Sequence, residues 1–348
     1  MIISPQVNLF KYLNAVAKKF LIIRFSSIGD IVLTTPVIRC LRKQYPDDEI
    51  HFLTKHSFRG IVAHNPYINK IHTLGDDFDA MLHELAAEEF DYVIDLHHNL
   101  RTLRVKKFLK KAKSFSFSKL NVEKFILTNF KINTLPKKHI VDRNFECIRS
   151  LNVVNDGLGL DYFIPAMDEV KNDDIPLSHM HGYIAIVIGA ALATKKLPLH
   201  KLEELCAAIG HPIILLGGKE DHEAGKAIAR QDEIKIYNAC GKFNLNESAD
   251  LVKKAKLVIT HDTGLMHIAA ALQKPIISIW GNTVPAFGMY PYYGQRSNMQ
   301  YDVVEINKLW CRPCSKIGYK KCPRGHFKCM ENIAVNDIVN LTRQRLQK

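Results

Sequence analysis

The 348-residue chain is 47% hydrophobic and 24% charged, an ordinary globular composition with enough apolar material for about two domains. Its longest nearly uninterrupted apolar run, Tyr183 to Ala193, is too short for a membrane span, which takes about 20 residues. The formal net charge of +13 favours anionic partners such as nucleic acid, acidic lipid or phosphorylated glycolipid, and charge does not choose among them.

Residues 1–18 are predicted to form a short amphipathic N-terminal extension. Their apolar positions are spaced helically and interrupted by Lys11 and Lys18, and we find no clear signal-peptide cleavage site. Two interpretations stay open, because such a helix can pack on the protein's own surface or lie on a membrane surface.

The first half alternates buried-type strands with helices. Strands are predicted at 19–25, 49–54 and 92–97, and helices at 31–45 and 81–89. This alternation is typical of a parallel sheet covered by helices. Between 101 and 138 many basic residues gather, and they form either a solvated helix face or a surface for an anionic partner.

A second alternation follows the polar, pattern-free segment 167–182, which we interpret as a linker. Its strands are predicted at 183–189, 212–218, 256–262 and 275–281, and its helices at 199–210, 220–231 and 264–273. The sequence therefore predicts an α/β protein with two doubly wound, Rossmann-like domains, 19–166 and 183–330, that face a central cleft. The last stretch, 331–348, is expected to be a helix that packs back on the N-terminal domain.

The stretch THDTGLMHIAAAL places polar groups between a strand and a small apolar helix. Thr263 and Gly264 fall at the helix N-terminus and His267 one turn later, an arrangement suited to a diphosphate because free N–H groups point outward there. Asp262 would cap the helix or accept hydrogen bonds from sugar hydroxyls. A plain N-cap with a core histidine is the alternative.

In RFSSIGDIVLTTP, Ser26, Ser27 and Gly29 form a tight strand-to-helix turn, and Asp30 begins the helix. Asp30 is either a general base that faces the cleft or a carboxylate that only satisfies the helix dipole.

Two further strand ends carry charged side chains. In GAALATKKLP, Lys195 or Lys196 could neutralise a leaving diphosphate. In LLGGKEDHE, the paired glycines give a tight turn and Glu220 is placed to bind ribose hydroxyls.

Together with KKLP, LLGGKED and the cysteine-rich CRPCSKIGYKKCPRGHFKC, the blocks SSIGD and DTGLMHIAAAL give the chain a resemblance to glycosyltransferase family 9 from about Lys19 to Met330. That family contains the ADP-heptose–lipopolysaccharide heptosyltransferases. The resemblance implies the GT-B fold, with the acceptor on the N-terminal domain and the nucleotide-sugar on the C-terminal domain. It also implies inversion at the anomeric carbon, and no cofactor or catalytic metal.

The resemblance also implies roles for single residues. By motif, Asp30 matches the catalytic base, Lys195 the lysine that contacts the donor phosphates, and Glu220 the ribose-binding acid. The remaining matched residues are the donor-binding turn, Asp262, Thr263, Gly264 and His267, and the acceptor-side residues, Ser26, Ser27 and Arg101. Arg101 lies in a loosely matching loop, and Leu197 replaces the tryptophan usual in the family.

Two other groups of residues are candidate metal ligands. The four cysteines Cys311, Cys314, Cys322 and Cys329 could hold a structural zinc, but only one CxxC pair is present, so reduced thiols or an occasional disulfide are the preferred interpretation. The DxD at Asp77–Asp79 lies beside a predicted helix start, away from the donor motifs, and is interpreted as helix capping.

The sequence thus predicts an enzyme that moves heptose from ADP-heptose to a phosphorylated lipopolysaccharide-core acceptor. It would work in the cytoplasm, peripherally on the inner-membrane surface. A different nucleotide-sugar or acceptor is the near alternative. A zinc-bearing nucleic-acid-binding protein would explain the charge and the cysteines, but not the glycine turns at strand ends. We therefore expect no nucleic-acid partner.

Overall fold

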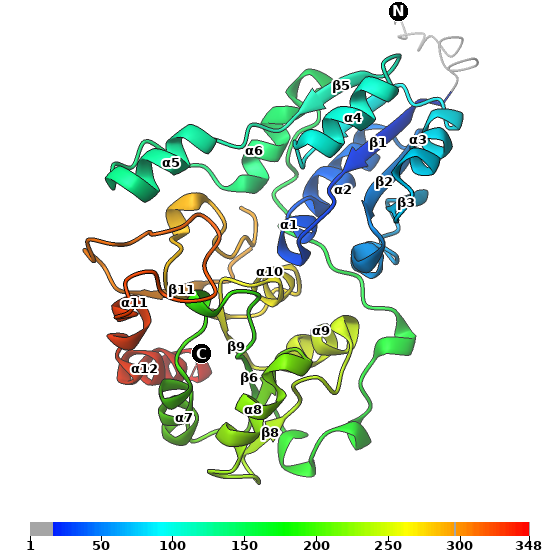
Figure 1. Ribbon diagram of the computed structural model, residues 1–348. Helices are drawn as coiled ribbons and strands as arrows, with labels where there is room; N and C mark the ends of the chain where they lie inside the picture. Colours follow the sequence, from blue (N-terminus) through cyan, green and yellow to red (C-terminus); the bar gives the residue numbers. More distant parts are fainter. Residues whose placement is uncertain (1–16, 296, 348) are drawn as a thin grey trace, which may run out of the picture.

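The computed structural model describes residues 17–295 and 297–347, and the chain builds two parallel sheets one after the other (Figure 1). The first has the order β3-β2-β1-β4-β5, and every neighbouring pair is parallel. Its strands are β1 (Lys19–Ile23), β2 (Glu49–Lys55), β3 (Lys70–Leu74), β4 (Tyr92–Asp95) and β5 (Lys113–Ser116).

The second sheet has the order β11-β10-β9-β6-β7-β8 and is also parallel throughout. Its strands are β6 (Ile184–Val187), β7 (Ile213–Leu216), β8 (Ile236–Asn238), β9 (Leu257–His261), β10 (Ile276–Trp280) and β11 (Tyr301–Glu305). In each sheet the order in which strands are added reverses next to the strand that comes first in the chain, β1 or β6, as in the Rossmann fold. The predicted α/β class with two doubly wound sheets is confirmed.

Helices surround both sheets, and α5 projects away from the first sheet (Figure 1). In the first half they are α1 (Ile28–Val32), α2 (Thr35–Gln44), α3 (Phe78–Ala87), α4 (Leu100–Phe108), α5 (Asn121–Phe130) and α6 (Ile140–Cys147). In the second half they are α7 (Leu199–Ala208), α8 (His222–Ala229), α9 (Leu245–Lys254), α10 (Gly264–Ala271), α11 (Lys328–Glu331) and α12 (Val335–Leu346). The single helix predicted at 31–45 is two helices, because Pro36 lies in the first turn of α2 and has no N–H to continue the ladder from α1.

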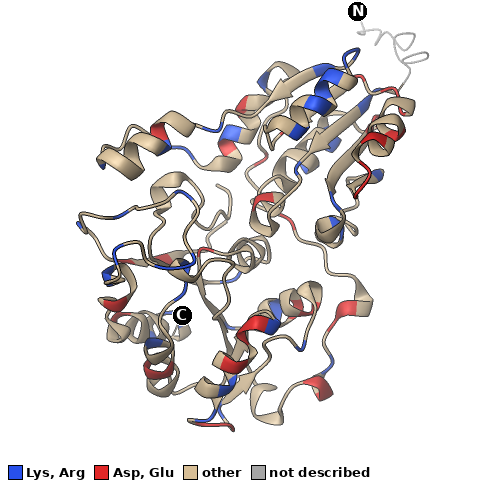
Figure 2. Ribbon diagram, in the orientation of Figure 1, with Lys and Arg blue, Asp and Glu red and all other residues tan. Residues whose placement is uncertain are grey.

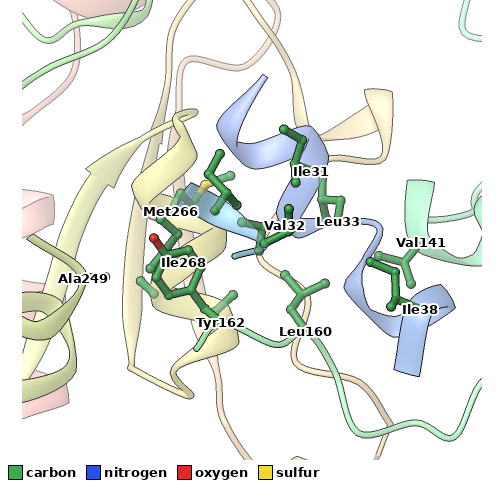
Figure 3. Close-up of a cluster of buried hydrophobic side chains, with 14 of the residues drawn as sticks. Ile31, Val32, Leu33, Ile38, Val141, Leu160, Tyr162, Ala249, Met266 and Ile268 are labelled. Atoms are coloured by element: carbon green, nitrogen blue, oxygen red, sulfur yellow. The ribbon is translucent and has the colours of Figure 1, made fainter. Parts of the chain in front are cut away.

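One hydrophobic core joins the two halves. Ile31 and Val32 of α1 and Met266 and Ile268 of α10 belong to the same buried cluster, together with Tyr162 from the chain that leaves the first half (Figure 3). Because α1 follows β1 and α10 follows β9, the carboxyl ends of these two strands are held facing each other.

The C-terminal helix packs on a different domain from the one predicted. Helix α12 packs on α7 and on β9 and β10 of the second sheet, not on the N-terminal domain. Its apolar face is covered there, because Ile338 and Val339 are buried with Leu202 and Leu205 of α7. Arg345 fixes the helix end through two hydrogen bonds to Asp302 of β11, at 2.7 and 2.9 Å.

Two other predicted segments have different outcomes. The segment predicted as the linker runs along the second half, where Asn246 donates to Asp168 at 2.8 Å and the Val170 N–H donates to Asp250 at 2.9 Å. Most of the predicted N-terminal extension, residues 1–16, lies outside the described residues.

Candidate active site

The central feature of the second domain is an ion pair across the point where its strand order reverses. Lys195 follows β6 and Asp262 follows β9, and these strands are neighbours. The Lys195 ammonium lies 2.7 Å from an Asp262 carboxylate oxygen and donates to the Asp262 carbonyl at 3.2 Å. Thr283 donates to the same carboxylate at 3.0 Å. Ligands of parallel α/β sheets bind at this kind of position.

Helix α10 begins beside this pair. Among the described residues, no side chain caps its N-terminus. Thr263 is the N-cap residue, and its hydroxyl makes no capping hydrogen bond but lies 3.3 Å from the Thr260 hydroxyl. Asp262 therefore does not cap the helix, which was one of its two predicted tasks. The first N–H groups of α10, from Gly264 onward, are left for an anion.

A second ion pair joins the loops after β6 and β7. Lys196 forms an ion pair with buried Asp221, which also accepts a hydrogen bond from the Gly218 N–H at 3.0 Å. The neighbouring Glu220 is exposed, and its carboxylate lies over Gly218, where a methyl group would come within 2.3 Å of it. Glu220 thus stands at the same sheet edge as Lys195 with an accessible carboxylate.

In the first domain Asp30 occupies the corresponding edge. One carboxylate oxygen lies 2.6 Å from the Arg24 guanidinium, and the other accepts from the Ser27 hydroxyl at 2.8 Å and the Ser27 N–H at 3.2 Å. Burial opposes ionisation, but Arg24 and Ser27 outweigh it and hold the pKa of Asp30 below its ordinary value. The carboxylate is therefore charged at neutral pH, and its side chain is 20% exposed.

Arg24 was not among the residues predicted from the sequence. Its guanidinium also donates to the carbonyls of Ser26, at 2.9 Å, and of Leu96, which follows β4. Arg24 therefore ties together the loops after β1 and β4, the two strands at the reversal point of the first sheet. A basic residue at the end of a buried strand, six residues before Asp30, was the available signal.

The two candidate loops meet where α1 contacts α10. His267 is 2% exposed and lies against Gly29, and Gly264 lies against Ile28. Burial lowers the pKa of His267 to about 4, and its Nδ1 atom has no hydrogen-bond partner among the described residues. Lys195 and Asp262 lie together beside Thr263 and Gly264 at the start of α10, whereas His267 lies in the contact between the halves.

Basic side chains gather near Asp30, and two of them, Arg143 and Lys316, lie outside the basic stretch 101–138 that the sequence showed. Lys119 and Lys124 flank the start of α5, Arg143 of α6 donates to the Ser118 carbonyl at 2.6 Å, and Lys316 approaches from the cysteine-rich segment of the other domain. Burial and then repulsion from Arg143 and Lys316, only partly offset by Asp30, lower the pKa of Lys124 to about 8.

The predicted acceptor-side residues differ in exposure. Ser26 is half-buried, Ser27 is exposed, and Arg101 is exposed in the first turn of α4. Figure 2 shows further Lys and Arg along α4.

The cysteine-rich segment packs against the loops after β6 and β10. Thr194 and Tyr319 exchange hydrogen bonds, and Arg312 donates to the carbonyls of Gly281 and Thr283. The four cysteines of the segment and His326 line one small cavity, with the Cys311 sulfur 3.8 Å from the His326 ring. Within the described residues they form no disulfide, and no three of their ligand atoms lie within 4.8 Å of one another.

The DxD motif is a helix cap, as predicted. Asp77 accepts a hydrogen bond from the Ala80 N–H at 2.8 Å at the start of α3, and Asp79 pairs with Arg104 at 3.0 Å. Across the described part of the chain, we find no helix that is both long and apolar enough to cross a membrane.

Comparison with solved structures supports the two-domain architecture. The chain superposes on E. coli ADP-heptose lps heptosyltransferase II with a TM-score of 0.72 at 20% identity, covering 94% of this chain and 99% of that one. An E. coli heptosyltransferase solved with ADP-2-deoxy-2-fluoro heptose gives a TM-score of 0.65 at 20% identity, with coverages of 94% and 99%. The fold is therefore GT-B, as the resemblance implied.

Sequence comparison gives the family. Lipopolysaccharide heptosyltransferase 1 of Campylobacter coli is 27% identical over 358 residues, which cover 94% of this chain and 98% of that protein. Lipooligosaccharide heptosyltransferase 2 of Haemophilus influenzae is 25% identical over 293 residues, covering 77% and 84%. The model of glycosyltransferase family 9 (heptosyltransferase) matches residues 79–321. With more than half of its length matched, the chain belongs to glycosyltransferase family 9.

Proposed function

We propose that the enzyme transfers heptose from ADP-heptose to a lipopolysaccharide inner-core acceptor, with inversion and without a catalytic metal. The names of the relatives support heptose as the sugar and lipopolysaccharide as the acceptor class. The alternative is that this enzyme carries out the same chemistry with another nucleotide-sugar or another acceptor.

The observation that carries the proposal is the Lys195–Asp262 pair beside the uncapped start of α10. An ammonium and a helix N-terminus together supply the positive potential that a departing diphosphate needs. Thr263 and Gly264 would bring backbone N–H groups to the phosphates. The exposed Glu220 carboxylate would accept hydrogen bonds from the ribose hydroxyls.

Asp30 is the proposed general base. It would take the proton from the acceptor hydroxyl, whose oxygen then bonds to the anomeric carbon as the bond from that carbon to the diphosphate breaks. ADP leaves with the electron pair, and Lys195 and α10 stabilise its new charge. One base and one stabilised leaving group suffice for a single inverting displacement.

The acceptor and the membrane would meet the protein near α5. Lys119, Lys124, Arg143 and Lys316 are suited to the phosphates of a glycolipid. Helix α5 and the residues after it expose apolar side chains to solvent, namely Val122, Phe125, Phe130 and Ile132. Exposed apolar groups beside lysines are typical of proteins that bind anionic membrane surfaces, which supports peripheral binding at the cytoplasmic face of the inner membrane.

Calorimetric titration without added metal tests the donor. ADP-heptose should bind saturably, whereas UDP-, GDP- and CMP-sugars should not. Preference for another nucleotide would discard the heptose assignment while leaving the proposed chemistry intact. A transfer assay in EDTA tests metal independence, since loss of turnover there would contradict it.

A further inference from the structure

Two buried histidines face each other on neighbouring strands of the first sheet, away from the proposed active site. His51 of β2 and His72 of β3 are each 1% exposed. The His51 Nδ1 atom lies 3.0 Å from the His72 Nε2 atom. The ring of Phe90 packs edge-on against both imidazoles.

The outer nitrogens of both rings face carboxylates. His51 Nε2 lies 3.1 Å from Glu49, and His72 Nδ1 lies 2.8 Å from Glu84. A carboxylate only accepts hydrogen bonds, so each outer nitrogen carries the ring proton. With both rings neutral, the two inner nitrogens point lone pairs at each other, and a cation bound between them would relieve their repulsion.

Glu88, which follows α3 as its C-cap residue, completes the group. One carboxylate oxygen of Glu88 and one ring nitrogen from each histidine all lie within 4.8 Å of one another. The C-terminus of α3 adds negative potential at the same place. Glu88 also pairs with Lys19, at 3.4 Å, and with Lys70. Since Lys70 is half exposed, its ammonium can turn into solvent when another cation approaches.

The charged side chains around the two histidines carry a net negative charge, which favours the binding of a cation. Glu49, Glu84 and Glu88 contribute three negative charges, and Lys19 and Lys70 contribute two positive ones, so one negative charge stays uncompensated. Two nitrogens bound tetrahedrally to zinc are separated by about 3.3 Å, close to the inner-nitrogen separation here. Histidine ligands whose second nitrogen donates to a carboxylate are typical of metal sites.

We propose that His51, His72 and Glu88 bind a divalent transition-metal ion of the zinc class, with water completing the coordination. Imidazole and carboxylate together favour zinc, cobalt or nickel over magnesium or calcium. The ion would clamp β2 and β3 to the end of α3. Lys19 and Glu49, which border the group, begin β1 and β2, whereas Asp30 follows the opposite end of β1. The site is therefore structural and takes no part in sugar transfer.

Tag-free, chelator-treated protein titrated with Zn²⁺ and Co²⁺ tests the site. Zn²⁺ should raise the melting temperature of the wild type and of His83→Gln, whose exposed histidine lies on α3. In His72→Gln the affinity should fall at least tenfold. Bound Co²⁺ should show visible d–d bands without the intense near-ultraviolet absorption of thiolate ligands, which separates this site from the cysteine cluster. Glu88→Gln, less buried, repeats the test if His72→Gln fails to fold.

Three results would overturn the proposal. The first is an unchanged Zn²⁺ effect in both His72→Gln and Glu88→Gln. The second is equal loss of the effect in His83→Gln, which would indicate adventitious surface binding. The third is a wild-type melting temperature that Zn²⁺ leaves unchanged, which would show that the pair binds no metal of this class.

Discussion

Gly29 of α1 and His267 of α10 touch so closely that a methyl group on Gly29 would lie 2.4 Å from the His267 Cδ2 atom. On the other side of the same contact, a methyl group on Gly264 would lie 2.7 Å from Ile28. These two glycines therefore set the distance between the loop that carries Asp30 and the loop that carries Asp262. A chain with larger residues there would hold the two halves of the proposed site farther apart.

Gly29→Ala should reduce kcat/KM at least tenfold while the protein stays folded. The added methyl group overlaps His267, which is buried and has little freedom to move, so α1 and α10 must separate, and misplaced reacting groups are costly. Steady-state assays and thermal melts measure the effect. Gly75→Ala is the control, because no atom lies within 4 Å of the methyl group it adds. Adding His267→Ala to Gly29→Ala should restore part of the lost melting temperature, and full activity in Gly29→Ala alone would refute the argument.

Asp30→Asn should lower kcat by about 10²–10⁴-fold, the usual contribution of a general base, and leave ADP-heptose binding near normal. The amide keeps the shape of the carboxylate but cannot take a proton at neutral pH. Single-turnover transfer and calorimetric binding separate the two effects. Asp79→Asn is the matched control, since its ion pair with Arg104 is exposed and should contribute little. If Asp30→Asn lost donor binding instead, Asp30 would have no claim to the base role.

Lys195→Ala should weaken both donor binding and turnover, with kcat reduced by about 10²–10³-fold, as when one donor to a developing anion is removed. Its ammonium is 2.7 Å from Asp262, so the variant also leaves that carboxylate without its cation. Lys195→Arg separates the effects, because it keeps the charge and should recover part of the binding. Lys253→Ala, on the exposed face of α9, should behave as wild type. Unchanged turnover in Lys195→Ala would remove it from the leaving-group role.

Much of the proposed site was predictable because its residues are local to strand ends. The turn at Ser26–Asp30 and the helix start at Thr263–Gly264 are short stretches whose glycines and polar side chains follow buried strands. The strands β3 and β5 were missed, because KIHTL and KSFS contain few apolar residues. Their places in the sheet come from pairing with β2 and β4 rather than from their own pattern.

Contacts between the halves could not be read from the sequence. Gly29 and His267 are far apart in the chain, and no local pattern pairs them. Lys316 joins the basic group near Lys124 only because the cysteine-rich segment folds toward α5. The pattern of α12 shows an apolar face but not which surface covers it, and for this reason its predicted packing on the N-terminal domain was wrong.

Acid should destabilise the protein through His139, which lies between α6 and the chain near Tyr290. Its Nδ1 atom accepts from the Val141 N–H at 3.2 Å, and its Nε2 atom, 2.9 Å from the Tyr290 carbonyl, therefore carries the proton. A second proton would have to sit on Nδ1, against the Val141 N–H. Burial, the largest cause, lowers the pKa of His139 to about 3.

The sign follows from proton uptake on unfolding. The unfolded chain binds a proton at this histidine below about pH 6.5, whereas the folded chain resists it down to about pH 3. The contribution of His139 to stability is therefore complete above pH 6.5 and is lost as the pH falls, by up to about 1.4 kcal/mol per pH unit. Urea unfolding between pH 6.5 and 5 should show His139→Gln with a flatter dependence than wild type. His181→Gln, an exposed histidine, should keep the wild-type slope, and a wild-type slope in His139→Gln would show that His139 titrates alike in both states.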